Sequence, residues 1–228
     1  MSSQTVDILL ATYNGGTFLP EQIESIFSQT FTNWRIIARD DGSTDETVQV
    51  LREYATRYPG RINVVVNPEK ALRAKDNFAR LMEYATAPYI MFCDQDDVWL
   101  PDKIEVSLKR IVELEKVFGQ GKPLLLHTDL KVVNSKLEPI GDSFWKYQNL
   151  QPEHSKCWRN LLVQNTVTGC TTLFNRSLAR LAHPIPPRAI MHDWWLALVA
   201  SLFGRVEYLN QQTVLYRQHS SNDTGAKA

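Results

Sequence analysis

Short apolar runs alternate with segments of helical periodicity along the first 120 residues, and this alternation constrains the fold more than any other feature. The apolar runs predict buried strands at residues 6–11, 34–38, 62–66 and 89–93. Apolar residues at helical spacing predict helices over 20–29, around 48–55, over 78–85 and from 101 onward. Strands and helices that take turns in this way predict an α/β fold, with a mostly parallel, Rossmann-like sheet covered by helices on both faces.

The alternation weakens after about residue 122. The elements expected there are strands at 124–127 and 171–174, a polar stretch at about 134–153, a helix over 193–202, and two short strands at 206–209 and 213–217. No repeat, low-complexity tract or Pro/Gly linker divides the chain. We therefore expect one domain over residues 1–228 with two unequal halves, of which the second is smaller and mixed.

The composition excludes several classes of protein. Lysine plus arginine equals aspartate plus glutamate, at 25 each, so the charge balance gives no reason to expect a nucleic-acid partner. The three cysteines are widely spaced without a CxxC pair, which argues against a disulfide framework and a zinc–cysteine site. No run approaches the ~18 apolar residues of a membrane span, and the N-terminus lacks a signal-peptide pattern. We therefore expect a soluble, cytoplasmic protein without a transmembrane segment.

Three polar clusters each follow a predicted strand: TYNGG at 12–16, DDGSTD at 40–45 and DQDD at 94–97. Ligands of open parallel sheets bind outside the carboxyl ends of the strands, so we expect these clusters to share one edge. A turn and a helix cap explain DDGSTD without a ligand, because Ser43 and Glu46 have the spacing of a capping box. DQDD is harder to explain in this way, because capping needs one acidic group and three carboxylates repel one another.

The Asp-x-Asp pattern within DQDD predicts a site for a hard divalent cation. Oxygen ligands suit Mg²⁺ or Mn²⁺, which retain waters and accept phosphate oxygens as further ligands. Neither a Walker A sequence nor G-x-G-x-x-G occurs in the chain, so ATP hydrolysis and dinucleotide binding lose support. A cation site without a P-loop indicates a diphosphate that is handled as a leaving group.

Four segments, ILLATYNGGTFLPEQIESIFSQTF, RDDGSTDET, FCDQDDVWLPDKI and MHDWWLAL, occur in the order and spacing of family 2 inverting glycosyltransferases with the GT-A fold. The chain resembles this family from about residue 6 to 222, and YRQHSSN is most similar to its bacterial rhamnosyltransferase-like branch. The resemblance implies a GT-A domain that uses Mn²⁺ or Mg²⁺. About 1–120 would bind a nucleotide-sugar donor, and about 121–228 would bind the acceptor.

Matched by position, the resemblance assigns the nucleotide to the strand ends. Thr12 and Tyr13 match residues that line the base and the ribose. Asp40 or Asp41 matches the aspartate that contacts the base, and Asp94 matches a further donor-binding position.

The loop after the third strand departs from the family's pattern. Many members have a Gly-rich, Arg-containing segment there, whereas this chain has NPEKALRAKDNFARL. Arg73 or Lys75 is the candidate for a diphosphate contact, with solvated loop charges as the alternative.

The resemblance also implies the metal ligands. Asp94 and Asp96 match the Asp-x-Asp pair, with Asp96 as the direct ligand. His219 matches a late histidine that adds a metal or diphosphate contact, and Asp97 is interpreted as a cap of the next helix.

The acceptor side is assigned to MHDWWLAL and NTVTGCTTLF. Asp193 matches the catalytic base, although an aspartate at a helix start is also a plain N-cap. Trp194 and Trp195 either stack on an acceptor sugar or belong to the core. His192 is either a partner of the site or a surface residue, and Gly169 would permit a close approach of the backbone.

The chemistry of sugar transfer agrees with these assignments. Displacing a nucleoside diphosphate builds negative charge that a cation offsets, and the attacking hydroxyl must lose a proton to a carboxylate. A nucleotidyltransferase and a non-catalytic carbohydrate-binding module stay open as alternatives. A nucleotidyltransferase should have a basic, Gly-rich loop near its N-terminus, yet no lysine or arginine follows TYNGG until Arg35. The second would have little reason to keep both Asp-x-Asp and Asp193.

From the resemblance alone we expect dTDP-rhamnose as the donor. The acceptor would be a growing cell-surface polysaccharide, either lipid-linked or an oligosaccharide. Its synthesis would take place at the inner face of the plasma membrane, with peripheral membrane association.

Overall fold

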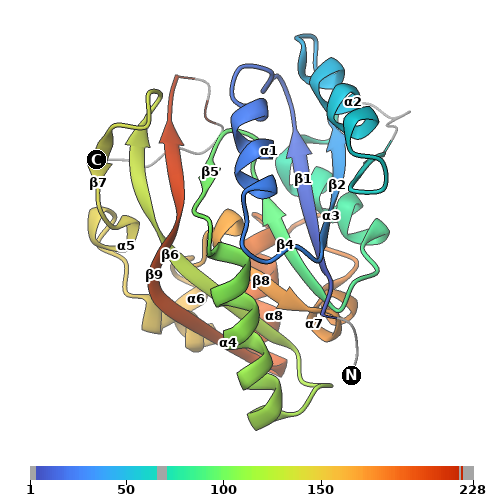
Figure 1. Ribbon diagram of the computed structural model, residues 1–228. Helices are drawn as coiled ribbons and strands as arrows, with labels where there is room; N and C mark the ends of the chain where they lie inside the picture. Colours follow the sequence, from blue (N-terminus) through green and yellow to red (C-terminus); the bar gives the residue numbers. More distant parts are fainter. Residues whose placement is uncertain (1–3, 66–70, 221, 223–228) are drawn as a thin grey trace.

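The computed structural model describes residues 4–65, 71–220 and 222. Within these ranges the chain builds one nine-stranded sheet in the order β3-β2-β1-β4-β8-β6-β9-β5, with β7 paired to β6. Figure 1 shows the strands crossing the whole molecule, with helices packed against them. One sheet therefore runs through both halves of the chain.

The apolar runs of the first half form the parallel part of the sheet. These strands are β1 (Val6–Thr12), β2 (Trp34–Asp40), β3 (Ile62–Val65) and β4 (Tyr89–Cys93). β1 pairs in parallel with β2 and β4, and β2 pairs in parallel with β3. The helices that follow them are α1 (Leu19–Phe27), α2 (Thr47–Arg57), α3 (Arg73–Tyr84) and α4 (Lys103–Phe118). The predicted alternation is confirmed, and position 66 of the third predicted strand lies outside the described residues.

The second half adds antiparallel pairs to the sheet. Its strands are β6 (Leu124–Asn134), β7 (Pro139–Gly141), β8 (Leu173–Asn175) and β9 (Arg205–Gln218). The short strand β5 (Val98–Trp99) of the first half pairs antiparallel with β9. Its helices are α5 (Phe144–Tyr147), α6 (Trp158–Leu161), α7 (Arg176–Ala182) and α8 (His192–Phe203), with 3₁₀ turns η1 (Pro152–Lys156) and η2 (Gly169–Thr171). β8 lies antiparallel between β4 and β6 and so joins the two halves.

The two short closing strands expected at 206–209 and 213–217 are one strand, so that prediction is wrong. Polar residues 210–212 interrupt the apolar pattern in the sequence. The backbone of β9 nevertheless stays paired with β6 on both sides of them, through a shift of register around Asp129.

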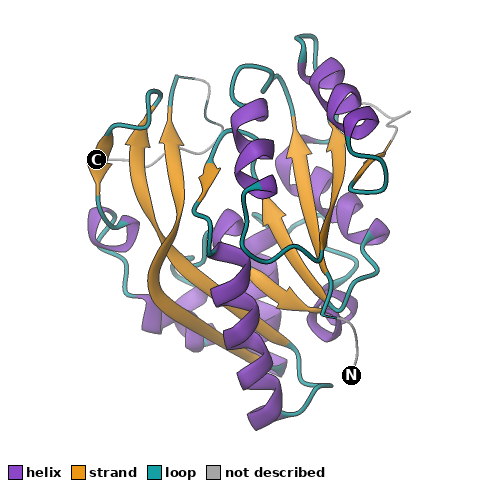
Figure 2. Ribbon diagram, viewed as in Figure 1, coloured by secondary structure: helices purple, strands orange, loops and turns teal. Residues whose placement is uncertain are grey.

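Apolar clusters pack on both faces of the sheet because successive strand residues point to opposite sides. In β1, Ile8 and Leu10 join the cluster that includes residues of α1, α2 and α4, whereas Leu9 joins the cluster of α3, α7 and α8. Figure 2 shows these helices around the strands. The predicted coverage of both faces is confirmed. Among the described residues, no helix combines the length and apolar character needed to cross a membrane.

The start of α2 differs from the prediction, because Ser43 and Glu46 form no capping box. Glu46 makes no side-chain cap, and Ser43 Oγ bonds the backbone of the first β–α loop instead. Asp45 holds the helix start: Oδ1 accepts from Thr47 N at 3.0 Å, and Oδ2 accepts from Gly16 N at 3.0 Å. Burial alone would raise the pKa of Asp45, but the hydrogen bonds from Thr47 and Gly16 lower it.

We expect Asp45→Ala to lower the free energy of unfolding by about 1 kcal/mol, because the start of α2 loses its acceptor. Glu46→Ala is the matched control, since this exposed side chain makes no cap, and it should change stability by less than ~0.5 kcal/mol. Urea denaturation at pH 7, where the lowered pKa keeps Asp45 ionised, measures both variants. A larger loss of unfolding free energy in Glu46→Ala than in Asp45→Ala would support the capping box instead.

Candidate active site

The carboxyl ends of β1, β2 and β4 meet at one edge of the sheet, toward the top of Figure 1. Thr12 at the end of β1 lies directly beside Asp40 at the end of β2. We name the loops that follow these strands the first loop (residues 12–16), the second loop (40–45) and the acidic loop (94–97). The three predicted clusters therefore share an edge, as expected.

Asp40 organises the second loop. Its carboxylate accepts hydrogen bonds from Gly42 N at 3.0 Å, Ser43 N at 2.8 Å and Thr12 Oγ1 at 3.0 Å. Gly42 has a φ of +92°, which side chains rarely tolerate, so this turn requires glycine. Asp40 and Thr12 thus lie together at the sheet edge, and the neighbouring Tyr13 is 55% exposed.

Asp41 has a different set of partners. Its carboxylate accepts from Leu72 N at 2.8 Å and Arg73 N at 2.7 Å, and it pairs with Arg39 at 3.1 Å. Both Asp41 and Arg39 are buried. Asp41 therefore supports the start of α3 and neutralises Arg39, which leaves Asp40 as the aspartate beside Thr12 at the strand ends.

Arg73 and Lys75 belong to the first turn of α3. Arg73 is exposed, and its backbone N–H donates to Asp41. Lys75 Nζ donates to Pro187 O at 2.7 Å and pairs with Asp76 at 3.3 Å. The ammonium of Lys75 thus links α3 to the segment before α8, and the diphosphate contact of Arg73 or Lys75 stays a prediction.

Asp96 and His219 meet although 123 positions separate them in the sequence. His219 Nε2 lies 2.9 Å from Asp96 Oδ2, and the side chains are 12% and 15% exposed. The ring of His219 packs on Phe18, with 4.7 Å between ring centroids. The structure therefore brings two predicted metal residues together at a position that solvent still reaches.

Asp97 is fully buried, and its Oδ1 accepts from Arg217 N at 3.1 Å. Burial and the charges of Asp96 and Asp94 raise the pKa of Asp97 well above its usual range. The interpretation of Asp97 as a helix cap is wrong, because the N-cap residue of α4 is Asp102. The hydrogen-bond partner of this carboxylate comes from β9, which is distant in the sequence, and not from the helix that follows.

Arg217 bonds the backbone of the acidic loop. The sequence alone did not identify this residue. It is buried, and it donates from Nε to Asp96 O at 2.7 Å and from Nη1 to Ser135 O at 2.8 Å. It also pairs with Glu21 and lies over the ring of Phe18 at 4.6 Å. The single charge within the strand segment VLYRQ was the signal that could have found it.

This region includes carboxylates that could bind a hard divalent cation. Asp94, Asp97 and Cys170 each place one ligand atom within 4.8 Å of the others. Burial raises the pKa of the Cys170 thiol well above its usual range, so this protonated sulfur suits a hard ion poorly. Asp96 and His219 contact each other but do not belong to this group, so the predicted set of Asp94, Asp96 and His219 as cation ligands stays a prediction.

Asp193 lies in the first turn of α8, whose N-cap residue is Met191, so the plain N-cap interpretation is wrong. Its Oδ2 accepts from Gly169 N at 2.9 Å, and its Oδ1 accepts from Trp194 N at 2.6 Å. Burial raises the pKa of Asp193 to about 6, against the opposing effect of these bonds. A carboxylate with a pKa this close to neutrality is suited to accept a proton.

Gly169 and His192 pack behind Asp193. A Cβ on Gly169 would lie 3.1 Å from His192 Nε2, so the backbone approaches closely, as expected. The ring of His192 is buried, with ring centroids 4.1 Å from Phe78 and 4.6 Å from Phe92. Burial lowers the pKa of His192 to about 3, so the ring is neutral. The interpretation of His192 as a surface residue is wrong.

The two tryptophans after Asp193 lie in different surroundings. Trp195 packs against the cluster of α3, α7 and α8, and its Nε1 donates to Ala182 O at 2.8 Å. This contact favours the core interpretation for Trp195. Trp194 is half-buried and donates from Nε1 to Leu161 O, so it is the better candidate to contact an acceptor sugar.

The turn η2 connects Asp193 to the acidic loop. Gly169 N donates to Asp193, and the next residue, Cys170, lies against Asp94 and Asp97. Asp193 and the carboxylates of the acidic loop therefore flank one short turn at the sheet edge.

The sequence profile of glycosyl transferase family 2 matches residues 7–179. The chain belongs to this family. RfbG of Shigella flexneri, named a dTDP-rhamnosyl transferase, is 28% identical over 95% of this chain and 74% of its own length. WfgD of Escherichia coli, named a UDP-Glc:alpha-D-GlcNAc-diphosphoundecaprenol beta-1,3-glucosyltransferase, is 25% identical over 76% of this chain and 60% of its own length.

The fold is that of solved glycosyltransferases. The mannosyltransferase PcManGT from Pyrobaculum calidifontis, in complex with GDP-Man and Mn²⁺, matches with a TM-score of 0.66 at 16% identity. The match covers 97% of this glycosyltransferase chain and 58% of the mannosyltransferase. The expected GT-A fold is confirmed.

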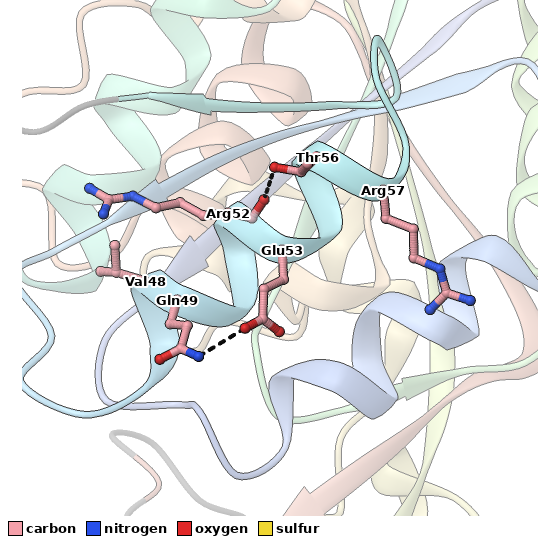
Figure 3. Close-up of a pocket in the computed structure, with 6 residues that line it drawn as sticks. All are labelled: Val48, Gln49, Arg52, Glu53, Thr56 and Arg57. Carbon is pink, nitrogen blue, oxygen red and sulfur yellow. Dashed lines mark hydrogen bonds between the residues drawn. The ribbon is translucent and has the colours of Figure 1, made fainter.

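A hollow on the outer face of α2 is separate from these groups (Figure 3). Its lining residues, Val48, Gln49, Arg52, Glu53, Thr56 and Arg57, all belong to this one helix. Gln49 donates to Glu53 at 2.8 Å, and Thr56 donates to the carbonyl of Arg52 at 2.8 Å. Their polar groups thus bond within the helix, and we assign no part of the glycosyltransferase site to this hollow.

The two aspartates of the second loop should give different variants. Asp41→Ala removes the carboxylate that pairs with buried Arg39 and that accepts from two backbone N–H groups, so the free energy of unfolding should fall by roughly 2–3 kcal/mol. Asp40→Ala should instead raise the donor KM of the glycosyltransferase about tenfold, and cost about 1 kcal/mol through the lost turn. Urea denaturation and donor titration measure the two effects. If donor affinity is unchanged in Asp40→Ala, the nucleotide does not bind beside Asp40.

Proposed function

We propose that the chain transfers a sugar from a nucleotide-sugar donor to a saccharide acceptor and inverts the configuration at the anomeric carbon. The observation that carries this proposal is the position of Asp193 and the acidic loop on either side of η2. One provides a buried base whose pKa is raised to about 6, and the other provides carboxylates for a cation. Membership of glycosyl transferase family 2 supports the same conclusion.

Asp193 is proposed as the general base. The acceptor hydroxyl gives its proton to the Asp193 carboxylate while its oxygen forms a bond to C1 of the donor sugar. The bond from C1 to the diphosphate oxygen breaks in the same step, and its electron pair leaves with the nucleoside diphosphate. A single displacement of this kind inverts the anomeric centre.

The donor is proposed to lie along the strand ends, with its base and ribose at the first loop and Asp40. Asp94, Asp96 and His219 would hold the divalent cation, Mn²⁺ or Mg²⁺. When bound, this cation offsets the negative charge of the leaving diphosphate. PcManGT, which shares the fold, has a structure in complex with GDP-Man and Mn²⁺.

Rhamnose from dTDP-rhamnose is the proposed sugar, because RfbG, named a dTDP-rhamnosyl transferase, is similar over 95% of the chain. The proposed acceptor is a lipid-linked or free oligosaccharide of cell-surface polysaccharide synthesis, since the name of WfgD includes a diphosphoundecaprenol acceptor. Residues 1–120 would bind the donor and 121–228 the acceptor. The reaction would take place in the cytoplasm, at the inner face of the plasma membrane.

Release of nucleoside diphosphate tests this function. Purified protein with Mn²⁺ and an oligosaccharide acceptor should release dTDP from dTDP-rhamnose faster than it releases UDP from UDP-glucose or GDP from GDP-mannose. Faster release from another donor would change the sugar, and no release from any donor would contradict the function.

Turnover should require a divalent cation, because the diphosphate and the acidic loop are both negatively charged. Excess EDTA should abolish the release of nucleoside diphosphate, and Mn²⁺ or Mg²⁺ should restore it. Asp96→Asn should abolish turnover and weaken donor binding. The matched control is Asp142→Asn at an exposed position, which should leave turnover and donor binding unchanged. Full activity in EDTA would exclude the cation from the reaction.

Asp193→Asn should lower kcat by ~10²- to 10⁴-fold and leave donor binding nearly intact, because the base acts on the acceptor. The base works as a carboxylate, and burial raises its pKa to about 6. The wild-type kcat/KM should therefore fall as the pH drops below about 6, and the residual activity of Asp193→Asn should lack this fall.

The product's configuration provides an independent check on this mechanism. A β-linked donor such as dTDP-β-L-rhamnose should give an α-linked product, which NMR of the anomeric proton identifies. Retained configuration would exclude a single displacement, and a near-wild-type kcat in Asp193→Asn would remove Asp193 from the role.

A further inference from the structure

Gln95, the middle residue of the Asp-x-Asp pattern, is bonded to the first loop. Its Oε1 accepts from Tyr13 N at 2.7 Å, and its Nε2 donates to Tyr13 O at 2.9 Å. One amide side chain thus binds both polar groups of one backbone residue, as a neighbouring strand does in a sheet ladder. The two residues are 82 positions apart in the sequence.

Gly15 leaves the space that the Gln95 side chain occupies. A Cβ on Gly15 would lie 2.2 Å from both Cδ and Oε1 of Gln95, which real atoms do not tolerate. Gly15 has no positive φ, so its backbone conformation does not require glycine. The contact with Gln95 therefore explains this glycine.

The first loop is also anchored on its other side. Asn14 N donates to Ser43 Oγ at 2.7 Å, and Gly15 N donates to Thr47 Oγ1 at 2.8 Å. The two bonds of Gln95 add a connection between this anchored loop and the acidic loop. A shift of either loop would have to break them.

We propose that Gln95 is a positioning residue that couples the first loop to the acidic loop. This inference rests on the proposed function, in which the first loop receives the base and ribose and the acidic loop receives the cation and diphosphate. Gln95 then fixes the distance between the two ends of the donor site before the donor arrives. The residue must be a neutral amide, since glutamate cannot donate to Tyr13 O and would add a charge beside Asp94 and Asp96.

The test compares Gln95→Ala, Gly15→Ala and their double variant. Binding of dTDP, UDP and GDP in the presence of Mn²⁺ is measured by calorimetry, next to binding of Mn²⁺ alone. Gln95→Ala should bind the preferred nucleotide about tenfold more weakly, the loss expected from one to two hydrogen bonds. Gly15→Ala should do the same, because its methyl group displaces the amide. The double variant should be no weaker than either single variant, because both changes remove the same contact.

Binding of Mn²⁺ alone distinguishes positioning from general loosening. It should stay within about twofold of wild type in every variant, because the proposed cation ligands, Asp94, Asp96 and His219, include no residue of the first loop. In turnover, the donor KM should rise and kcat should stay nearly constant. Gln49→Ala, which removes a glutamine whose amide donates to Glu53 within α2, is the control and should bind like wild type. Gln95→Met, which keeps the side-chain volume without the hydrogen bonds, should match Gln95→Ala and serves if the alanine variant does not fold.

Each outcome bears on one statement. If wild type binds dTDP, UDP or GDP and Gln95→Ala binds it equally well, the positioning role is wrong and the proposed function stands. Additive losses in the double variant, or a parallel loss of Mn²⁺ binding, would also overturn the role. If wild type binds none of dTDP, UDP and GDP, the proposed function fails and the inference fails with it.

Discussion

Three carboxylates follow β4 within four residues, and their mutual repulsion must be offset wherever the rest of the chain packs around them. Lys103 is fully buried near the acidic loop, and burial lowers its pKa to about 8. Arg217 donates to the backbone of the acidic loop, and His219 meets Asp96. These three partners come from α4 and from the end of the chain, so the acidic loop depends on both.

Burial assigns different tasks to residues of one type. Asp41 is enclosed by N–H donors and supports α3, whereas Asp40, its neighbour, stays beside Thr12 at the strand ends. Asp193 accepts from the backbone N–H groups of Gly169 and Trp194 in a buried position, and burial raises its pKa to about 6. A count of aspartates at the sheet edge would miss these distinctions, because they depend on which groups surround each carboxylate.

The sequence predicts what depends on local pattern. The alternation of apolar runs with helical segments predicted the parallel strands β1 to β4, and the rule for strand ends predicted that the polar clusters share an edge. What it could not predict depends on distant partners: Asp97 bonds β9 instead of a nearby helix, and Gln95 bonds a backbone 82 positions away. The prediction of two short closing strands was wrong for the same reason, because β9 pairs with β6 on both sides of three polar residues and continues as one strand.

The 14-residue strand β9 has a consequence for how this site is recognised in related chains. Its last residue is Gln218, so Arg217 stands at its end and His219 directly follows it. A chain cut just before Arg217 would retain all three strand-end clusters and Asp193, and a motif search would score it as complete. It would nevertheless lack Arg217, which donates to the backbone of Asp96, and His219, which contacts its carboxylate. The presence of the familiar motifs is therefore no measure of an intact centre, and the two residues at the end of the last strand are the ones to inspect.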